Sequence, residues 1–137
     1  MTTTESLTAQ SRSIVEQFYD AGLRGDIEVM MGLLSDDVVI HEPAFLTYGG
    51  EYHGKEGLQA IYEKVLAITD VTKLKVHYFV VDGDRAIAIA GFPVNGDKDY
   101  TLFAEESRIA HGKIVEMRLY YHEPQSLLRG SATGAGP

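Results

Sequence analysis

The sequence predicts an α+β domain in which helices come first and a largely antiparallel sheet follows. Apolar residues recur at helical spacing over the first third of the chain and again after residue 54. From residue 73 onward, alternating apolar stretches are separated by short turns that contain glycine. Helices followed by a run of strands are typical of α+β proteins. A chain of 137 residues also suits one domain with one core.

Composition narrows the range of partners. The formal net charge of -8 argues against nucleic acid or an anionic membrane surface, since each attracts a positively charged patch. The chain contains no cysteine, which excludes disulfides, thiolate metal ligands and a thiol nucleophile. No signal peptide is recognised at the N-terminus, and no apolar run approaches the roughly 20 residues that span a bilayer. We therefore expect a cytoplasmic protein.

The N-terminal part predicts two helices and a strand. We expect residues 1–10 to form a flexible leader. An amphipathic first helix should end near Gly25, a plausible C-cap, and Asp26 is placed to cap a second, shorter helix. The β-branched residues 38–42 predict a strand that ends at Pro43, because proline cannot donate a hydrogen bond to a sheet ladder.

The middle of the chain predicts a loop and a third helix. Residues 44–53 are rich in glycine and tyrosine, and we interpret them as a flexible lid over a pocket. A third helix should begin at Gly54. Its apolar face is formed by Leu58, Ile61, Tyr62, Val65 and Ile68.

The C-terminal half predicts a meander of four strands. Asn95-Gly96 between two of them is a strong hairpin signal, since both residues tolerate positive φ. Such a sheet packs its helices on one face, so the other face should be covered by a homodimer partner. Residues 130–137 are small and glycine-rich. We expect residues 126–137 to form a flexible tail, which leaves residues 11–125 as the domain. The predicted strands cover residues 73–81, 85–94, 100–110 and 113–122.

Five short motifs together resemble a known family. Their order and spacing are similar to the ketosteroid isomerase and SnoaL-like polyketide cyclase group of the nuclear transport factor 2-like superfamily. The resemblance implies a cone-shaped, strongly curved mixed or antiparallel sheet, wrapped around N-terminal helices that cap a deep apolar pocket. It does not fix the function, because one fold of this kind hosts isomerases, cyclases, epoxide hydrolases, dehydratases and binders. The motifs are Gly25-Asp26, residues 34–39 (LSDDVV), Glu42-Pro43, residues 52–57 (YHGKEG) and residues 112–118 (GKIVEMR).

Glu42 is the first candidate catalytic residue. The resemblance implies that a carboxylate before a proline at this place shuttles a proton. A carboxylate in an apolar pocket is poorly solvated, so its pKa rises and it becomes a better base towards a C–H beside a carbonyl. Because neighbouring strand residues point to opposite faces, His41 remains the alternative inward residue. An exposed Glu42 at the strand end also remains possible, since glutamate is rarely buried.

Glu105 is the second candidate. Strand alternation places it on one face with Phe103, among mostly apolar neighbours, where a lone carboxylate is costly unless it is protonated or paired. The resemblance implies an acid held neutral to donate a hydrogen bond to an oxyanion, a role that belongs to the ketosteroid isomerases themselves. The alternative is that Glu105 or Glu106 forms an ion pair with Arg108 or Arg118 across the sheet.

Two departures from the family limit the predicted activity. The first-helix tyrosine of ketosteroid isomerases falls at Phe18, and Tyr19 lies about 100° further round the helix, so we expect an incomplete oxyanion hole. In limonene epoxide hydrolase-like relatives an aspartate follows the last-strand arginine, whereas Arg118 is followed by Leu119. A phenol from elsewhere is an option. The predicted substrate-binding residues are Phe18, Tyr48, Tyr62, Tyr78, Phe103, Met117 and Tyr121.

The histidines and glycines predict no metal or cofactor site. No two histidines stand at metal-ligand spacing on one element, and no phosphate-binding loop is present. The small residues Ala86, Ala88 and Ala90 alternate along one predicted strand, and if they face inward they leave room for a ligand.

The function predicted from these residues is a cofactor-independent enzyme. It would act on a small apolar carbonyl compound that is polyketide-, terpenoid- or steroid-like. Glu42 would serve as base and Glu105 as oxyanion donor or second acid, giving isomerisation, cyclisation or dehydration. The alternatives are a non-catalytic small-molecule binding module, an epoxide hydrolase-like enzyme, and a dimerisation domain whose pocket is filled by side chains.

Overall fold

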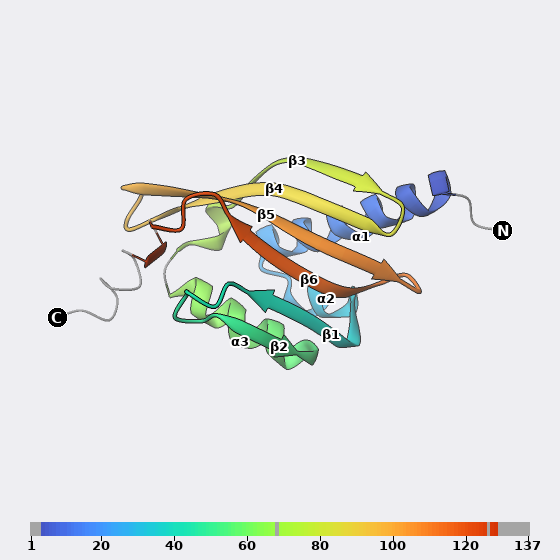
Figure 1. Ribbon diagram of the computed structural model, residues 1–137, viewed down its shortest axis with the longest axis horizontal. Helices are drawn as coiled ribbons and strands as arrows, with labels where there is room; N and C mark the ends of the chain where they lie inside the picture. Colours follow the sequence, from blue (N-terminus) through green and yellow to red (C-terminus); the bar gives the residue numbers. More distant parts are fainter. Residues whose placement is uncertain (1–3, 68, 126, 129–137) are drawn as a thin grey trace.

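The computed structural model describes residues 4–67, 69–125 and 127–128, which form three α-helices, a short 3-10 helix and six strands (Figure 1). Within these residues, no helix is long and apolar enough to cross a membrane. The elements are α1 (Thr4–Arg24), α2 (Ile27–Gly32), β1 (Leu34–Glu42), β2 (Gly50–His53), α3 (Gly54–Leu66), η1 (Val71–Lys73), β3 (Lys75–Asp82), β4 (Arg85–Val94), β5 (Asp99–Ala110) and β6 (Lys113–Tyr121). The predicted helices and strands occur in the predicted order, and β2 and η1 are additional elements.

The sheet is mixed and open, with strand order β2-β1-β6-β5-β4-β3. The antiparallel meander from β3 to β6 is confirmed. β1 returns to pair in parallel with β6, and β2 adds an antiparallel edge to β1. This arrangement puts the C-terminal end of β1, where Glu42 lies, close to the end of β6.

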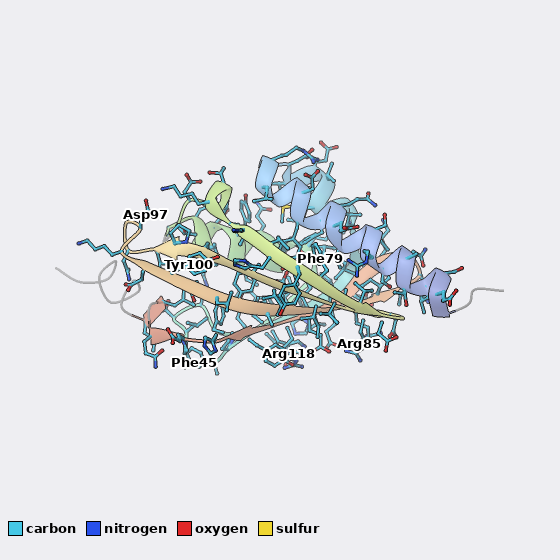
Figure 2. All side chains as sticks on the ribbon, turned by 90° about the horizontal axis from the view of Figure 1, so that it is seen from above. Phe45, Phe79, Arg85, Asp97, Tyr100 and Arg118 are labelled. Carbon is cyan, nitrogen blue, oxygen red and sulfur yellow. The ribbon has the colours of Figure 1, made fainter. Side chains whose placement is uncertain are left out.

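The helices cover one face of the sheet. α1 contacts β3 and β4, and α3 contacts β1 and β2. Figure 2 shows Phe79 of β3 on the side that faces α1, whereas Arg85 and Arg118 lie on the opposite side. We call the helix-covered side the inner face and the other side the outer face. The α+β class is confirmed, with an open sheet rather than a closed barrel.

Alternation along β5 follows the prediction from the sequence. Thr101, Phe103, Ser107 and Ile109 are buried on the inner face, and their neighbours are more exposed. Strand β6 does not follow the predicted alternation near its first residues, because its pairing with β5 shifts register between Arg108 and Ile109. The shift buries Ile114 completely, where alternation alone would have chosen Val115.

The first helix begins within the residues expected to be a leader. α1 starts at Thr4, and two side chains of its first half anchor it to the β3–β4 turn. The Thr8 hydroxyl accepts a hydrogen bond from the Gly83 N–H at 2.8 Å, and the fully buried Ser11 donates to the Gly83 carbonyl at 2.7 Å. At the other end, Leu127 is buried, whereas residue 126 and residues 129–137 of the expected tail lie outside the described residues, as does Ile68.

The stretch expected to be a flexible lid is part of the packed structure. Residues 50–53 form strand β2, and Tyr48 is only 3% exposed. Gly49 packs so closely on the preceding chain that a Cβ there would lie 2.2 Å from the Pro43 carbonyl oxygen. The Tyr52 hydroxyl donates to the Tyr48 carbonyl at 2.7 Å. The lid interpretation is therefore wrong, because glycine here permits close packing instead of mobility.

Candidate functional site

A pocket of about 140 Å³ lies between the helices and the inner face of the sheet. Its wall is mostly apolar, and it contains both predicted carboxylates, Glu42 and Glu105. The more exposed side of the pocket lies between α3 and η1, near Val65 and Val71. Five of the seven predicted substrate-binding residues also line it: Phe18, Tyr62, Phe103, Met117 and Tyr121.

Glu42 is the inward residue at the end of β1. It is 7% exposed, and burial, together with the nearby charge of Glu105, raises its pKa to about 8. His41 points to the outer face, where its Nε2 lies 2.9 Å from Glu116 Oε2. His41 is therefore not the inward alternative, because pairing with β6 fixes which face each residue of β1 occupies.

Glu105 faces the same pocket from the middle of β5. Burial raises its pKa to about 7, and a hydrogen bond from Tyr19 opposes part of that rise. Its neighbour Glu106 takes the cross-strand ion pair instead, with Arg85 Nη1 at 3.2 Å on the outer face. The predicted ion pair thus forms at Glu106, while Glu105 lies in the pocket. The predicted partners were wrong, because Arg108 and Arg118 lie closer to Glu116, at 3.6 and 4.0 Å.

Tyr19 is the residue that sequence reasoning missed. Its buried hydroxyl donates a short hydrogen bond to Glu105 Oε1, and both Phe18 and Tyr19 line the pocket. The expectation that Tyr19 turns away is wrong, because the pocket meets α1 over a wide arc that also includes Gly22. A signal was available, since Val15, Phe18, Tyr19 and Gly22 stand at positions i, i+3, i+4 and i+7 of one helical face.

A second phenol contacts Glu42. Tyr121, near the end of β6, has its hydroxyl 3.3 Å from Glu42 Oε1, a long hydrogen bond. Burial and the charge of Glu42 raise the pKa of Tyr121 well above its ordinary value. Each carboxylate of the pocket is therefore contacted by one tyrosine hydroxyl, Tyr19 for Glu105 and Tyr121 for Glu42.

Two predicted tyrosines do not line this pocket. Tyr48 lies near Tyr121 and Glu42. Burial and the charge of Glu42 raise the pKa of Tyr48 to about 12. Its hydroxyl is buried without a hydrogen-bond partner of good geometry. Tyr78 is 57% exposed on the outer face, because the pairing of β3 with β4 shifts register just before it, which sequence alternation could not reveal.

The electrostatics suit proton transfer near neutral pH. With pKa values of about 8 and about 7 for Glu42 and Glu105, the pair holds close to one proton between those pH values. One carboxyl group is then a hydrogen-bond donor while the other is a base, in the same apolar space. Among the described residues, no group of three or more side chains is arranged to hold a metal ion.

Comparisons with known proteins agree with this architecture. Residues 15–117 match the model of the SnoaL-like domain family. No curated protein matches the sequence. An NTF2-like protein from Burkholderia xenovorans LB400 is similar in structure, with a TM-score of 0.74 and 19% identity over 95% of this chain and 98% of that one.

Two further solved structures are similar. A candidate ketosteroid isomerase from Kribbella flavida DSM 17836 has a TM-score of 0.70 at 15% identity, over 85% of this chain and 80% of that one. A protein of unknown function with a cystatin-like fold from Xanthomonas campestris has a TM-score of 0.70 at 21% identity, over 85% of this chain and 93% of that one. At such low identity these likenesses establish the NTF2-like, cystatin-like fold alone.

Proposed function

The chain belongs to the SnoaL-like domain family, and we propose that its pocket is the active site of a cofactor-independent enzyme. The enzyme transfers a proton within a small apolar carbonyl compound. The observation that carries this proposal is the pair of carboxylates in one apolar pocket, each contacted by a phenol hydroxyl. Two buried acidic groups with raised pKa values are costly to the fold and are typical of acid–base sites.

The proposed chemistry starts at the carbon beside the carbonyl group. Glu42, in its ionised form, takes the proton from that carbon, and the electron pair moves onto the carbonyl oxygen to give an enolate. Protonated Glu105 and Tyr19 then donate hydrogen bonds to this oxygen, in place of the bond that they make to each other. This step uses the one-proton form in which Glu42 is ionised and Glu105 is protonated. It is the less populated one-proton form, because the pKa of Glu42, about 8, lies above that of Glu105, about 7.

The fate of the enolate decides the reaction subtype. Return of the proton from Glu42 to a different carbon gives isomerisation. Attack of the enolate carbon on a second carbonyl, with the proton passed to the new alkoxide, gives cyclisation. Loss of a hydroxyl from the carbon next to the enolate, as water with the proton from Glu42, gives dehydration. All three need the same base and the same oxyanion donors, so these groups alone do not distinguish between the three reactions.

The alternatives have less support. Epoxide hydrolysis of the limonene type would need an arginine among pocket acids, whereas the Arg118 side chain is 45% exposed on the outer face. A dimerisation domain with a filled pocket does not agree with the open space of about 140 Å³. A pure binding module remains the main competitor, but it has no need for two buried carboxylates with raised pKa values.

Replacing Glu42 tests the proposal directly. Glutamine keeps the shape of glutamate but cannot accept the proton, so Glu42→Gln should slow proton abstraction by at least about 100-fold. The measurement is loss of the α-proton signal from a panel of ketones and enones in deuterated buffer, followed by proton NMR. His41→Gln is the matched control, because its side chain faces the other side of the same strand.

The pH dependence of proton exchange, measured in the same assay, is a second test of the proposal. The active form holds one proton between the two carboxyl groups, so the rate of proton exchange should depend on pH as a bell-shaped curve with its maximum between about pH 7 and 8.

Near-normal exchange by Glu42→Gln would exclude the proposed role of Glu42. Exchange that falls equally in His41→Gln would point to a structural effect instead.

A further inference from the structure

The size of the pocket limits what can be bound. Its volume is about 140 Å³, whereas pockets for drug-sized ligands are roughly 300–1,000 Å³. A buried apolar cavity of about 150 Å³ is known to hold one benzene molecule. The space in this protein therefore matches one six-membered ring or an open chain of similar bulk.

The wall of the pocket leaves little room for expansion. Phe103 lies at the centre of it, with ring centroids 5.7 Å from Phe92 and 5.9 Å from Tyr121. Met117 is 1% exposed on β6, which pairs with a strand on each side. Close-packed interiors resist the insertion of extra carbon atoms, so a second fused ring would have to displace several of these side chains or project from the pocket between α3 and η1, where its apolar surface would stay in contact with water.

Neighbouring space does not lengthen the pocket. Ala86, Ala88 and Ala90 do face inward and are buried, but they do not line the pocket, and α1 packs over their strand. A groove of about 350 Å³ on the outer side touches Glu42, Leu119 and Tyr121. These three residues also line the pocket, so the two spaces adjoin at these side chains, and the groove lies on the other side of the sheet from the helices.

The polar groups of the pocket also select the ligand. Thr69, a further polar lining residue, already donates to the Pro93 carbonyl at 2.6 Å. The apolar part of the wall would leave a second polar group of the ligand unpaired, at a cost. An anionic ligand would be repelled by the charge that Glu42 and Glu105 share.

From the volume, the wall and the position of the carboxylates, we propose that the ligand is an uncharged one-ring or short-chain compound with a single carbonyl or enol oxygen. A steroid or a polycyclic polyketide is too large to be enclosed in this space. A ligand with one oxygen also selects isomerisation among the three reactions, since cyclisation and dehydration each need a second oxygen. This inference rests on the proposed function for the role of the oxygen, but the size limit itself depends only on the pocket.

A graded series of phenols tests the size limit, because a phenol hydroxyl resembles an enol. Phenol, 2-naphthol and estradiol carry one, two and four rings, and binding to the nitrogen-15-labelled protein is followed by NMR titration. Phenol should shift the amide signals of lining residues and bind at least tenfold more tightly than 2-naphthol, and estradiol should not shift them. Benzoate, a one-ring anion, should bind at least tenfold more weakly than phenol.

A pair of isoleucine variants checks that the pocket sets the limit. Ile61→Ala removes side-chain atoms from the α3 wall and so enlarges the pocket. The affinity for 2-naphthol relative to phenol should rise by about tenfold. Ile14→Ala removes an equally buried isoleucine of α1 that does not line the pocket, so it should leave the ratio unchanged. If Ile61→Ala does not fold, Ile61→Val makes a smaller change of the same kind.

The outcomes separate this inference from the proposed function. Tight binding of 2-naphthol or estradiol in the wild-type pocket, or failure of phenol to bind, would overturn the size limit. Size-selective binding together with exchange that does not depend on Glu42 would instead remove the enzyme proposal and leave the size limit intact.

Discussion

At the scale of single residues, Glu42 and Glu105 make the stability of the fold depend on pH. Both are carboxylates whose pKa is raised in the folded protein, to about 8 and about 7. In the unfolded chain they titrate near 4.5, so the folded state binds more protons between about pH 4.5 and 8. Their contribution to stability is therefore fully present below about pH 4.5 and is lost as the pH rises through 7 to 8.

This linkage predicts that the free energy of unfolding falls between pH 6 and pH 9, by a few kcal/mol in order of magnitude. Glu42→Gln removes the part due to Glu42, so the variant should lose less stability over this range and exceed the wild type at pH 9. Urea unfolding at the two pH values measures the difference. Glu116→Gln is the control, since the His41 hydrogen bond lowers the pKa of Glu116. Glu116 is therefore ionised in both the folded and the unfolded chain throughout this range, and the variant should lose as much stability as the wild type. A wild-type stability that is flat or rising from pH 6 to 9 would contradict the buried-carboxylate site.

Several pocket residues could be predicted from the sequence because simple alternation holds where strands are regular. Glu105 and Phe103 on β5 follow this rule, and Met117 and Tyr121 follow it on β6 after the register shift. Tyr78 was misplaced because a register shift in β3 cannot be read from side-chain types. The choice between His41 and Glu42 needed the pairing of β1 with β6.

At the scale of elements, strand β2 and the turn before it change the role expected for residues 44–53. A four-residue edge strand containing Gly, Glu, Tyr and His shows no apolar alternation, so its sequence does not predict a strand. Its pairing partner β1 supplies the register, from Val39 with His53 to Glu42 with Gly50. By contrast, β4 was predicted with its observed limits, because turns with positive φ bound it on both sides.

The tight packing of Gly49 makes a clear prediction. Gly49→Ala would bring a Cβ to 2.2 Å from the Pro43 carbonyl oxygen, and backbone cannot rotate away as a side chain can. We expect a loss of about 1–3 kcal/mol in the free energy of unfolding, measured by urea denaturation. Gly32→Ala is the matched control, because a Cβ on Gly32 meets nothing within 4 Å, and alanine there should be neutral or stabilising by up to about 1 kcal/mol. Equal stability of both variants would restore the interpretation of this stretch as a mobile lid.

At the scale of the whole molecule, the outer face of the sheet is the largest uncovered feature. Tyr78, Val80 and Tyr120 are each at least 50% exposed, and strand pairing places Ile87 and Ile89 beside them on the same face. Ion pairs border this apolar area, including Arg85 with Glu106 and Arg108 with Glu116. A surface with both apolar groups and charges of both signs can complement a second copy of itself.

We therefore expect a homodimer through the outer face, as the sequence also suggested. Light scattering after size-exclusion chromatography should give twice the mass of one 15.1 kDa chain. Val80→Lys places a charge within the contact and should raise the dissociation constant at least tenfold. Val29→Lys, at a site 39% exposed on α2, should leave the mass unchanged. A wild-type protein of single-chain mass at micromolar concentration would count against the dimer.

The overall architecture could be predicted further than the site could. Helical and strand periods give the order of elements, since each period reflects local geometry. The parallel pairing of β1 with β6 joins residues about 75 positions apart, such as Ile40 and Met117, and no local pattern encodes it. Glu42 reaches the pocket through that pairing, so the site depends on the part of the fold that local patterns do not specify.

The division of the pocket between sheet and helices has a consequence for evolution. The pocket carboxylates come from β1 and β5, whereas α3 contributes apolar wall residues such as Leu58 and Ile61. Substitutions on α3 can reshape the space for a ligand while the strands keep the acid–base groups in place. A lineage built in this way can acquire new substrates through changes in one helix and retain the inherited chemistry of its sheet.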